Sequence, residues 1–419
     1  MFDLTNLCIS AKKAGAGLLN VSEEKKSDAL RVVAKGLRDN AKYLIEENQK
    51  DISFAKEKGA TDAFIDRLTL NEKVIESMAV GLEQVAELDS PLGKITYAYE
   101  NKEQGIKIEK KTVPFGVVGI IYESRPNVTA DAFALCFKTS NAVILKGGSD
   151  SLRSNLAIVK VIREKLLECG INQDVVSVIE DTSRETTTRF MKMNKYVDLL
   201  IPRGGASLIR SAVENSTIPI IETGTGNCHI FVDQTADVKK TAEVVFNAKT
   251  QRYSVCNACE SLVIHSAILQ KVMPAIAEKL LEKSVVIRAD ERARQVIKDY
   301  PCLEKATEED FYTEYGSAII SVKTVDNIEQ AIEHINEHST RHSESIMTED
   351  KENAKRFMTE IDSSSVYHNA STRFSDGFVF GLGAEIGIST QKMHARGPMG
   401  LSALVTEKYL IFGDGAVRK

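Results

Sequence analysis

Several features that would assign the chain to a specialised class of protein are missing from its sequence. No apolar run among the 419 residues reaches the roughly 20 residues that a membrane-spanning helix needs. Basic residues do not outnumber acidic ones: 54 Lys and Arg stand against 59 Asp and Glu, which argues against nucleic acid as a partner. Residues 1–6 show no basic stretch leading into an apolar one, so no signal peptide is expected. These absences predict a cytoplasmic protein that binds neither a membrane nor nucleic acid.

Cysteine usage argues against a disulfide framework. The seven cysteines are odd in number and widely spread, which is typical of reduced thiols. Cys256 and Cys259 form one C-x-x-C, compatible with a redox pair or half of a zinc site, but no second half accompanies it. His334, His338 and His342 recur every four residues in a polar stretch, which favours a solvated helix face over a ligand set. The sequence therefore predicts no metal site.

Length and residue pattern predict more than one domain. A chain of 419 residues exceeds what one hydrophobic core usually supports, and residues 1–90 show the apolar spacing of helices. The polar alternating segments 95–99 and 106–110 predict a hairpin of exposed strands. A domain boundary is expected near 225, and an irregular, glycine-rich part from about 375.

From residue 113 onward, short apolar runs alternate with helical stretches. This alternation is typical of parallel βαβ units whose sheet is covered on both faces, and it predicts an α/β fold. The predicted strands are 117–121, 142–145, 175–179, 198–201, 218–221, 261–264, 318–322 and 364–367.

Cys256 is a candidate nucleophile. It lies where a predicted helix gives way to the strand 261–264, and a thiol at such a junction can be approached by a substrate and flanked by backbone N–H groups. Glu222 lies upstream, where a predicted strand runs into a glycine-rich turn, so the two residues form a plausible acyl-transfer pair. A free cysteine is more often a small buried hydrophobe, and these residues alone leave both interpretations open.

Three glycine-containing loops after predicted strands favour an anionic, nucleotide-like ligand. The loops are 144–149, 200–207 and 222–226, and none contains a G-x-G-x-x-G fingerprint or a Walker A loop. No acidic residue directly follows the strand ending at Lys146 to bind a ribose diol. Lys146, with Ser149 and Arg153 beyond it, suits a 2′-phosphate instead, which favours NADP.

Nine segments, in order along nearly the whole chain, resemble those of the gamma-glutamyl phosphate reductase family, a branch of the aldehyde dehydrogenase superfamily. The matching segments are 113–117, 122–129, 141–148, 201–205, 222–229, 255–258, 312–315, 369–374 and 394–401. With this resemblance, the interpretation of Cys256 as a nucleophile is strongly favoured.

The resemblance implies an α/β, aldehyde dehydrogenase-like fold in three parts. A Rossmann-type cofactor domain would comprise residues 1–94 and 113–224, and an α/β catalytic domain residues 225–400. Residues 95–112 and 401–419 would form a β-flap, an oligomerisation element. Polar alternating strands without a partner in their own domain are expected to pair across subunits of a homo-oligomer.

The resemblance also implies a chemistry for Cys256. NADPH would reduce L-glutamyl 5-phosphate to L-glutamate 5-semialdehyde with release of phosphate, through a thioacyl intermediate on Cys256, as the second step of proline biosynthesis from glutamate. In the superfamily an asparagine two residues before a proline donates to the oxyanion. Here Ser124 takes that place before Pro126 and Asn127 follows, so both are candidates beside the Cys256 N–H. Glu222 stands where the superfamily has its water-activating base, and we expect it to tune the thiol or to shape the nicotinamide pocket.

Further site residues and partners follow from the resemblance alone. Arg125 and Arg373 are expected to bind the phosphate and carboxylate of the substrate. The cofactor residues, for NADP, would be Lys146, Gly147, Ser149, Pro202, Arg203, Gly204, Gly205 and Glu314. The implied partners are the small-molecule substrate, further copies of the chain and a separate glutamate 5-kinase, with channelling of its labile product left open.

Three other functions remain open on the sequence. A hydrolytic or CoA-acylating aldehyde dehydrogenase would use the same cysteine with water or CoA in place of phosphate. A non-catalytic α/β binding protein would keep Cys256 as a structural residue. A thiol oxidoreductase would need Cys259 as much as Cys256.

Overall fold

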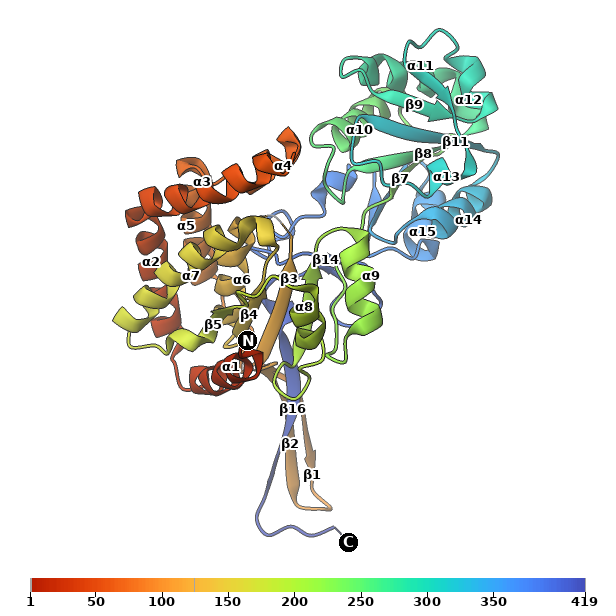
Figure 1. Ribbon diagram of the computed structural model, residues 1–419. Helices are drawn as coiled ribbons and strands as arrows, with labels where there is room; N and C mark the ends of the chain where they lie inside the picture. The colour runs from red at the N-terminus through yellow and green to blue at the C-terminus, as the bar shows by residue number, and fades with distance from the viewer. Residues whose placement is uncertain (1, 124, 419) are drawn as a thin grey trace. The chain divides into compact units, whose positions relative to one another are not determined.

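The computed structural model describes residues 2–123 and 125–418 and contains two compact units (Figure 1). Unit 1 comprises Met1–Glu222, Gly381–Gly387 and Met399–Lys419, and unit 2 comprises Thr223–Phe380 and Ile388–Pro398. The chain passes from unit 1 to unit 2 beside position 225, where the sequence predicts a boundary. Among the helices described, none combines the length and the apolar character that crossing a membrane requires.

The N-terminal part of unit 1 is helical, as predicted. Its helices are α1 Leu4–Leu18, α2 Glu23–Asp39, α3 Ala41–Glu57, α4 Asp62–Leu68 and α5 Glu72–Glu87. The side chain of Ser22 caps α2 by accepting a hydrogen bond from the Lys25 N–H. Leu30, Val33 and Leu37 are spaced along one helix face, and all three are fully buried.

A four-stranded parallel sheet in the order β5-β4-β3-β6 forms the centre of unit 1. Its strands are β3 Val117–Tyr122, β4 Ala142–Lys146, β5 Val176–Val178 and β6 Leu199–Arg203. The remaining helices and turns of this region are α6 Asn127–Lys138, η1 Ser149–Ser151, α7 Leu152–Glu168, η2 Gln173–Val175, α8 Arg184–Phe190 and α9 Ala206–Asn215. Helices α6 and α7 lie on one face of the sheet, and α1, α8 and α9 lie on the other (Figure 1). The strand order reverses between β3 and β6, and ligands of such sheets bind at this reversal, outside the carboxyl ends of the strands.

The predicted strand 218–221 is wrong. The chain there makes a single bridge, between Leu200 and Ile220, and continues as irregular backbone. Pro219 has no N–H to donate, so the pairing with β6 cannot extend into a regular ladder.

A three-stranded antiparallel sheet projects from the body of unit 1 (Figure 1). It consists of β1 Ile95–Asn101, β2 Ile106–Pro114 and β16 Val405–Gly413, in the order β1-β2-β16. The predicted hairpin of β1 and β2 is confirmed. The expectation that these strands lack a partner in their own domain is wrong, because β16 pairs with β2 along its whole length. The outer edges of β1 and β16 are the ones left without a neighbour in this sheet.

Unit 2 is built on a seven-stranded parallel sheet in the order β10-β9-β11-β8-β7-β12-β13. Its strands are β7 Cys228–Val232, β8 Cys259–His265, β9 Val286–Ala289, β10 Leu303–Lys305, β11 Ile319–Val325, β12 Ser343–Met347 and β13 Ser365–His368. Its helices are α10 Val238–Thr250, α11 Ser266–Leu281, α12 Glu291–Val296, α13 Glu308–Phe311, α14 Ile328–His338 and α15 Lys351–Glu360. Helices α10–α12 cover one face of the sheet, and α14 and α15 cover the other (Figure 1). The predicted strands at 261–264, 318–322 and 364–367 are confirmed as parts of β8, β11 and β13.

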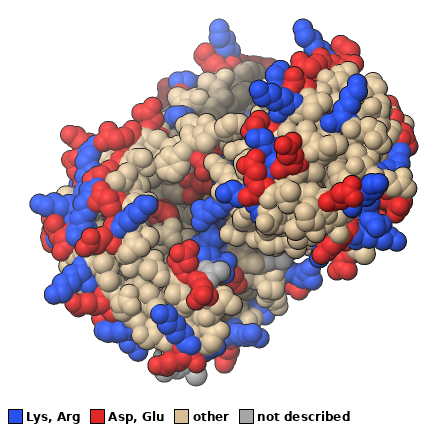
Figure 2. All heavy atoms as spheres, turned by 90° about the horizontal axis from the view of Figure 1, so that it is seen from above, with Lys and Arg blue, Asp and Glu red and all other residues tan. Residues whose placement is uncertain are grey.

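Short elements complete the chain after β13. They are η3 Thr372–Phe374, β14 Ile388–Ser389, β15 Gly397–Pro398 and η4 Leu401–Leu404. Acidic and basic side chains alternate over the face drawn in Figure 2. This mixed pattern is what the near balance of charges in the sequence predicts.

Candidate active site

Cys256 lies in a loop at the amino end of the sheet of unit 2. Helix α10 ends at Thr250 and β8 begins at Cys259, so residues 251–258 form the helix-to-strand junction that the sequence predicts. Cys256 is partly exposed, whereas Cys228 and Cys259 are fully buried. Burial raises the pKa of both buried thiols, which keeps them protonated and unreactive.

The backbone of Cys256 is held by the loop that leads into β7. The Cα of Gly226 packs against the Cys256 carbonyl so closely that a Cβ at position 226 would lie 1.4 Å from its oxygen. The Cys228 thiol donates a hydrogen bond to the same oxygen, at 3.1 Å. These two contacts fix the peptide that follows the candidate nucleophile.

We expect Gly226→Ala to lower kcat/KM by about 100-fold, because a displacement of about 1 Å at a reacting group has an effect of that size. The added methyl group must push the Cys256 carbonyl away, and the thiol with it. Steady-state kinetics and the rate of Cys256 alkylation measure the effect. Gly224→Ala is not a neutral control, since its Cβ would lie 2.2 Å from Thr390 Cγ2, whereas Gly17→Ala meets no atom within 4 Å and should retain activity.

Asn227 joins the same loop to two others, the one after α13 and the one after α14. Its backbone N–H donates to Thr340 Oγ1 at 2.9 Å, and its side-chain Nδ2 donates to the carbonyls of Phe311 and His338 at 2.7 and 3.0 Å. The Gly226 N–H hydrogen bonds to Glu314, which opposes the rise that burial causes in the pKa of this carboxyl. The amino ends of β7, β8, β11 and β12 are thereby joined around the candidate nucleophile.

The three histidines of the polar stretch are buried, so the prediction of a solvated helix face is wrong. His334 stacks on His338 with ring centroids 4.0 Å apart, and the edge of Phe311 lies against it at 5.1 Å. His342 lies beyond the helix and has no exposed surface. The hydrophobic face of α14 packs inward, and His334 and His338 are buried because they lie on this face. The described residues contain no group of His, Cys, Asp and Glu arranged to hold a metal ion.

Burial of these rings predicts loss of stability in acid. It lowers the pKa of His334 to about 2 and that of His342 to about 4, below the value near 6.5 of an unfolded histidine. Below about pH 6.5 the unfolded chain therefore binds protons that the folded chain does not. Protonation of each of these two histidines in the unfolded chain lowers the free energy of unfolding by up to about 1.4 kcal/mol per pH unit as the pH falls towards 4. Urea titrations at several pH values measure this slope, which should be shallower in His334→Asn; an unchanged slope would contradict the assignment.

The predicted cofactor residues of unit 1 lie at the carboxyl ends of adjacent strands. Lys146 ends β4, and its buried ammonium group donates to the Gly147 carbonyl at 3.0 Å. Burial lowers the pKa of Lys146, and the charge of Asp181 opposes this. Arg203 ends β6, directly before the N-terminus of α9.

The N-termini of α7 and α9 already carry carboxylates. Asp51 accepts hydrogen bonds from the Ser154 N–H and hydroxyl, at 2.8 and 2.6 Å, at the start of α7. Glu123 accepts one from the Gly205 N–H at 3.0 Å, and a Cβ at Gly204 would lie 2.6 Å from that carboxylate. The Gly205 N–H therefore already has an anionic partner, and a phosphate bound at Gly204 and Gly205, as the sequence predicts, would have to displace the Glu123 carboxylate. Neither carboxylate is detectable from the local sequence.

The remaining predicted residues of unit 1 lie at the start of α6 and at the end of the segment 1–222. Asn127 donates to Asp131 at 3.4 Å, and burial raises the pKa of Asp131 to about 6. Arg125 is partly buried, and Ser124 lies outside the described residues. Glu222 ends the first and longest segment of unit 1 and is partly buried.

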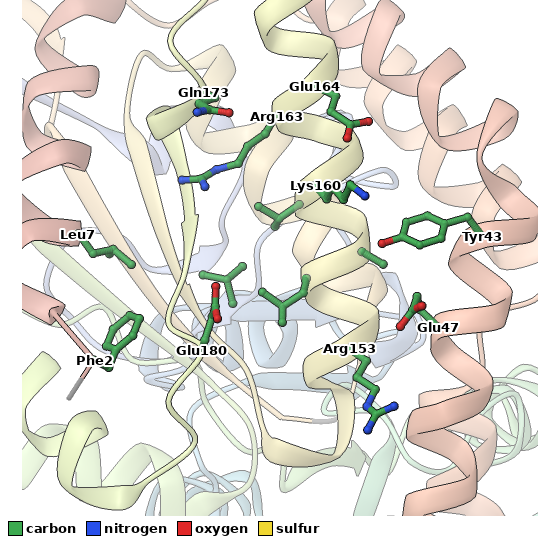
Figure 3. Close-up of a pocket in the computed structure, with 14 residues that line it drawn as sticks. Phe2, Leu7, Tyr43, Glu47, Arg153, Lys160, Arg163, Glu164, Gln173 and Glu180 are labelled. Atoms are coloured by element: carbon green, nitrogen blue, oxygen red, sulfur yellow. The ribbon is translucent and has the colours of Figure 1, made fainter.

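A cavity of about 560 Å³ lies along α7 in unit 1 (Figure 3). Tyr43 and Glu47 of α3 line one side of it, and Glu180, after β5, lines another. Arg153, at the start of α7, brings a cation to this cavity.

Comparison with known proteins identifies the family. The model of the aldehyde dehydrogenase family matches residues 3–296 and 305–385. The chain belongs to this family. The gamma-glutamyl phosphate reductase of Lachnospira eligens is 54% identical over 419 residues, and that of Caldicellulosiruptor saccharolyticus is 49% identical over 420, with 100% of each chain covered. The crystal structure of gamma-glutamyl phosphate reductase from Thermotoga maritima matches with a TM-score of 0.96 at 44% identity, again over 100% of both chains.

More distant members of the aldehyde dehydrogenase family share the fold. An acetylating aldehyde dehydrogenase from Geobacillus thermoglucosidasius is 16% identical and matches with a TM-score of 0.69. The predictions of an aldehyde dehydrogenase-like α/β fold, of the family and of an oxidoreductase are therefore confirmed.

Proposed function

We propose that the chain catalyses the reduction of L-glutamyl 5-phosphate to L-glutamate 5-semialdehyde by NADPH, with release of phosphate, in proline biosynthesis. The main support for this proposal is the setting of Cys256. Its side chain is partly exposed, and contacts with Gly226 and Cys228 fix the backbone of its loop. Full-length relatives at 54% and 49% identity that bear the name gamma-glutamyl phosphate reductase support the choice of substrate.

Cys256 performs the covalent chemistry in this proposal. Its thiolate attacks the C5 acyl carbon, the bond from that carbon to the phosphate oxygen breaks, and phosphate leaves. The carbon–sulfur bond breaks after reduction, when the thiolate is released with the aldehyde. The Cys256 N–H and the Asn127 side chain are the proposed oxyanion donors, and one such donor contributes about 3–4 kcal/mol to transition-state stabilisation. Glu222 is proposed to tune the thiol rather than to activate water, because hydrolysis would waste the activated acyl group.

The residues of unit 1 fit a nicotinamide cofactor. The strand order reverses at β3 and β6, and Lys146 supplies a cation at the end of β4. NADPH, when bound, supplies the hydride that reduces the thioacyl group. Arg153 and its cavity would accept the adenosine end with its 2′-phosphate. The proposed cofactor residues are Lys146, Gly147, Ser149, Pro202, Arg203, Gly204, Gly205 and Glu314.

We propose that the projecting sheet joins copies of the chain. Tyr99 and Ile411 flank Ile108 on one face of this sheet, and both are at least half exposed. Apolar residues on an open-edged sheet are typical of an interface. Light scattering should give a mass above the 46.2 kDa of one chain, and Ile411→Lys should reduce it. A wild-type monomer would contradict this assignment.

The reverse reaction tests the function. Purified protein, glutamate 5-semialdehyde and NADP+ should form NADPH only when inorganic phosphate is added, because phosphate must attack the thioacyl group to release it. Turnover that ignores phosphate would identify a hydrolytic dehydrogenase, and turnover that requires CoA would identify an acylating one. The absence of any turnover would favour a binding protein.

A further inference from the structure

Arg373 is a half-buried arginine that forms no salt bridge with the described residues. Among the described residues, no carboxylate lies within ion-pair distance of its guanidinium, and its one side-chain hydrogen bond runs from Nε to Gln251 Oε1 at 2.9 Å. Burial and the charge of Arg252 lower the pKa of Arg373, whereas the charges of Cys256 and Asp376 raise it. This partly buried cation near the nucleophile therefore has two terminal nitrogens, Nη1 and Nη2, that no described residue uses.

The loop that carries Arg373 is fastened to the loop that carries Cys256. The Thr372 hydroxyl donates to the Asn257 carbonyl at 2.7 Å, and Asn257 Nδ2 donates to the Ser375 carbonyl at 2.8 Å. Gln251 lies in the same nucleophile loop, directly after α10. Contacts on both sides of Arg373 thus set the position of its guanidinium relative to the nucleophile.

We propose that Gln251 is a positioning residue that holds Arg373 as the subsite for the phosphoryl group of the substrate. This inference rests on the proposed function. In L-glutamyl 5-phosphate one oxygen atom joins the phosphoryl group to the carbon that Cys256 attacks, whereas the α-carboxylate lies several bonds further along the chain. An arginine close to the thiol therefore meets the phosphoryl group. Because Nε is held by Gln251, Nη1 and Nη2 remain for two parallel hydrogen bonds to phosphate oxygens.

The reverse reaction separates this role from a merely structural one. With aldehyde and NADP+ saturating, Gln251→Ala should raise the KM for inorganic phosphate by about tenfold, the size expected when one hydrogen bond to a charged group is lost. The KM values for aldehyde and NADP+ should stay within about twofold of wild type. Gln251→Glu should also raise the KM for phosphate, because a carboxylate paired with Arg373 repels the anion. Gln270→Ala, at an exposed glutamine on α11, is the matched control and should match wild type.

Two results would overturn the inference. An unchanged KM for phosphate in Gln251→Ala shows that Gln251 does not position Arg373. A rise confined to the KM for aldehyde assigns Arg373 to the α-carboxylate instead. Both results are compared with a wild-type enzyme whose turnover depends on phosphate. If wild-type turnover ignores phosphate, the proposed function itself has failed, and the two failures are therefore distinct.

Discussion

Cys256→Ala is expected to lower kcat in the phosphate-dependent reaction by about 10⁴-fold or more, as removal of a covalent nucleophile does in other enzymes. No neighbouring thiol can take over. Cys228 and Cys259 are fully buried, and burial raises the pKa of each. The loop should keep its shape, since the contacts that hold it at Gly226 and Cys228 are made to the Cys256 carbonyl. Steady-state kinetics with a circular dichroism spectrum of the folded variant measure this effect.

Cys259→Ser distinguishes the nucleophile from a redox pair. The Cys259 thiol is buried and contacts the Ser261 carbonyl at 3.4 Å, a contact that a hydroxyl can keep. We expect this variant to retain activity within about tenfold, since its change is confined to one buried polar contact. Equal loss of activity in Cys259→Ser and Cys256→Ala would contradict the acyl-transfer mechanism and support a thiol oxidoreductase.

The sequence predicts the apolar, fully buried strands β3, β4 and β8, but it misses β7, which is also buried along its whole length. The prediction also fails where one missing backbone N–H prevents strand pairing. The run 218–221 reads as a strand, but Pro219 cannot extend a ladder. The alternation of β1 and β2 predicts exposure correctly but cannot reveal that β16, about 300 residues later, supplies a third strand.

In the candidate site, too, the sequence predicts some residues and misses others. Cys256 and the junction around it follow from local pattern, and the motif resemblance adds Arg373. Gln251, Asn227 and Thr372 form hydrogen bonds with residues far away in the sequence, so no local spacing of residues predicts their roles. His334 is misjudged because its polar neighbours suggest solvent, whereas the inward face of α14 buries it.

A buried ion pair closes the base of the nucleophile loop. Lys249, near the end of α10, lies 2.5 Å from Glu260, near the start of β8, and neither side chain has exposed surface. Glu260 also accepts a hydrogen bond from the Gly316 N–H at 3.2 Å, which ties the loop carrying Glu314 to the same point. Burial raises the pKa of Glu260 to about 7, although the Lys249 charge opposes this shift.

Lys249→Met is expected to lower the free energy of unfolding by about 3–5 kcal/mol, because it leaves a buried carboxylate without its cation. Urea denaturation, with hydrogen exchange of the β8 amides, measures the loss. The double variant Lys249→Met/Glu260→Gln should recover much of it, since the amide oxygen still accepts from Gly316 and no charge remains buried. A double variant as unstable as the single one would show that packing, rather than charge, is responsible.

The pH dependence of Lys249→Met provides a second test. Without the ammonium group the folded-state pKa of Glu260 must rise further above its unfolded value, so the folded protein binds a proton that the unfolded chain loses. Stability is then retained near pH 4.5 and falls as the pH rises. The deficit relative to wild type should therefore grow as the pH rises above about 7, where Glu260 of the wild type ionises, and stay level below it. A deficit that is constant with pH would show that Glu260 does not carry the charge that Lys249 neutralises.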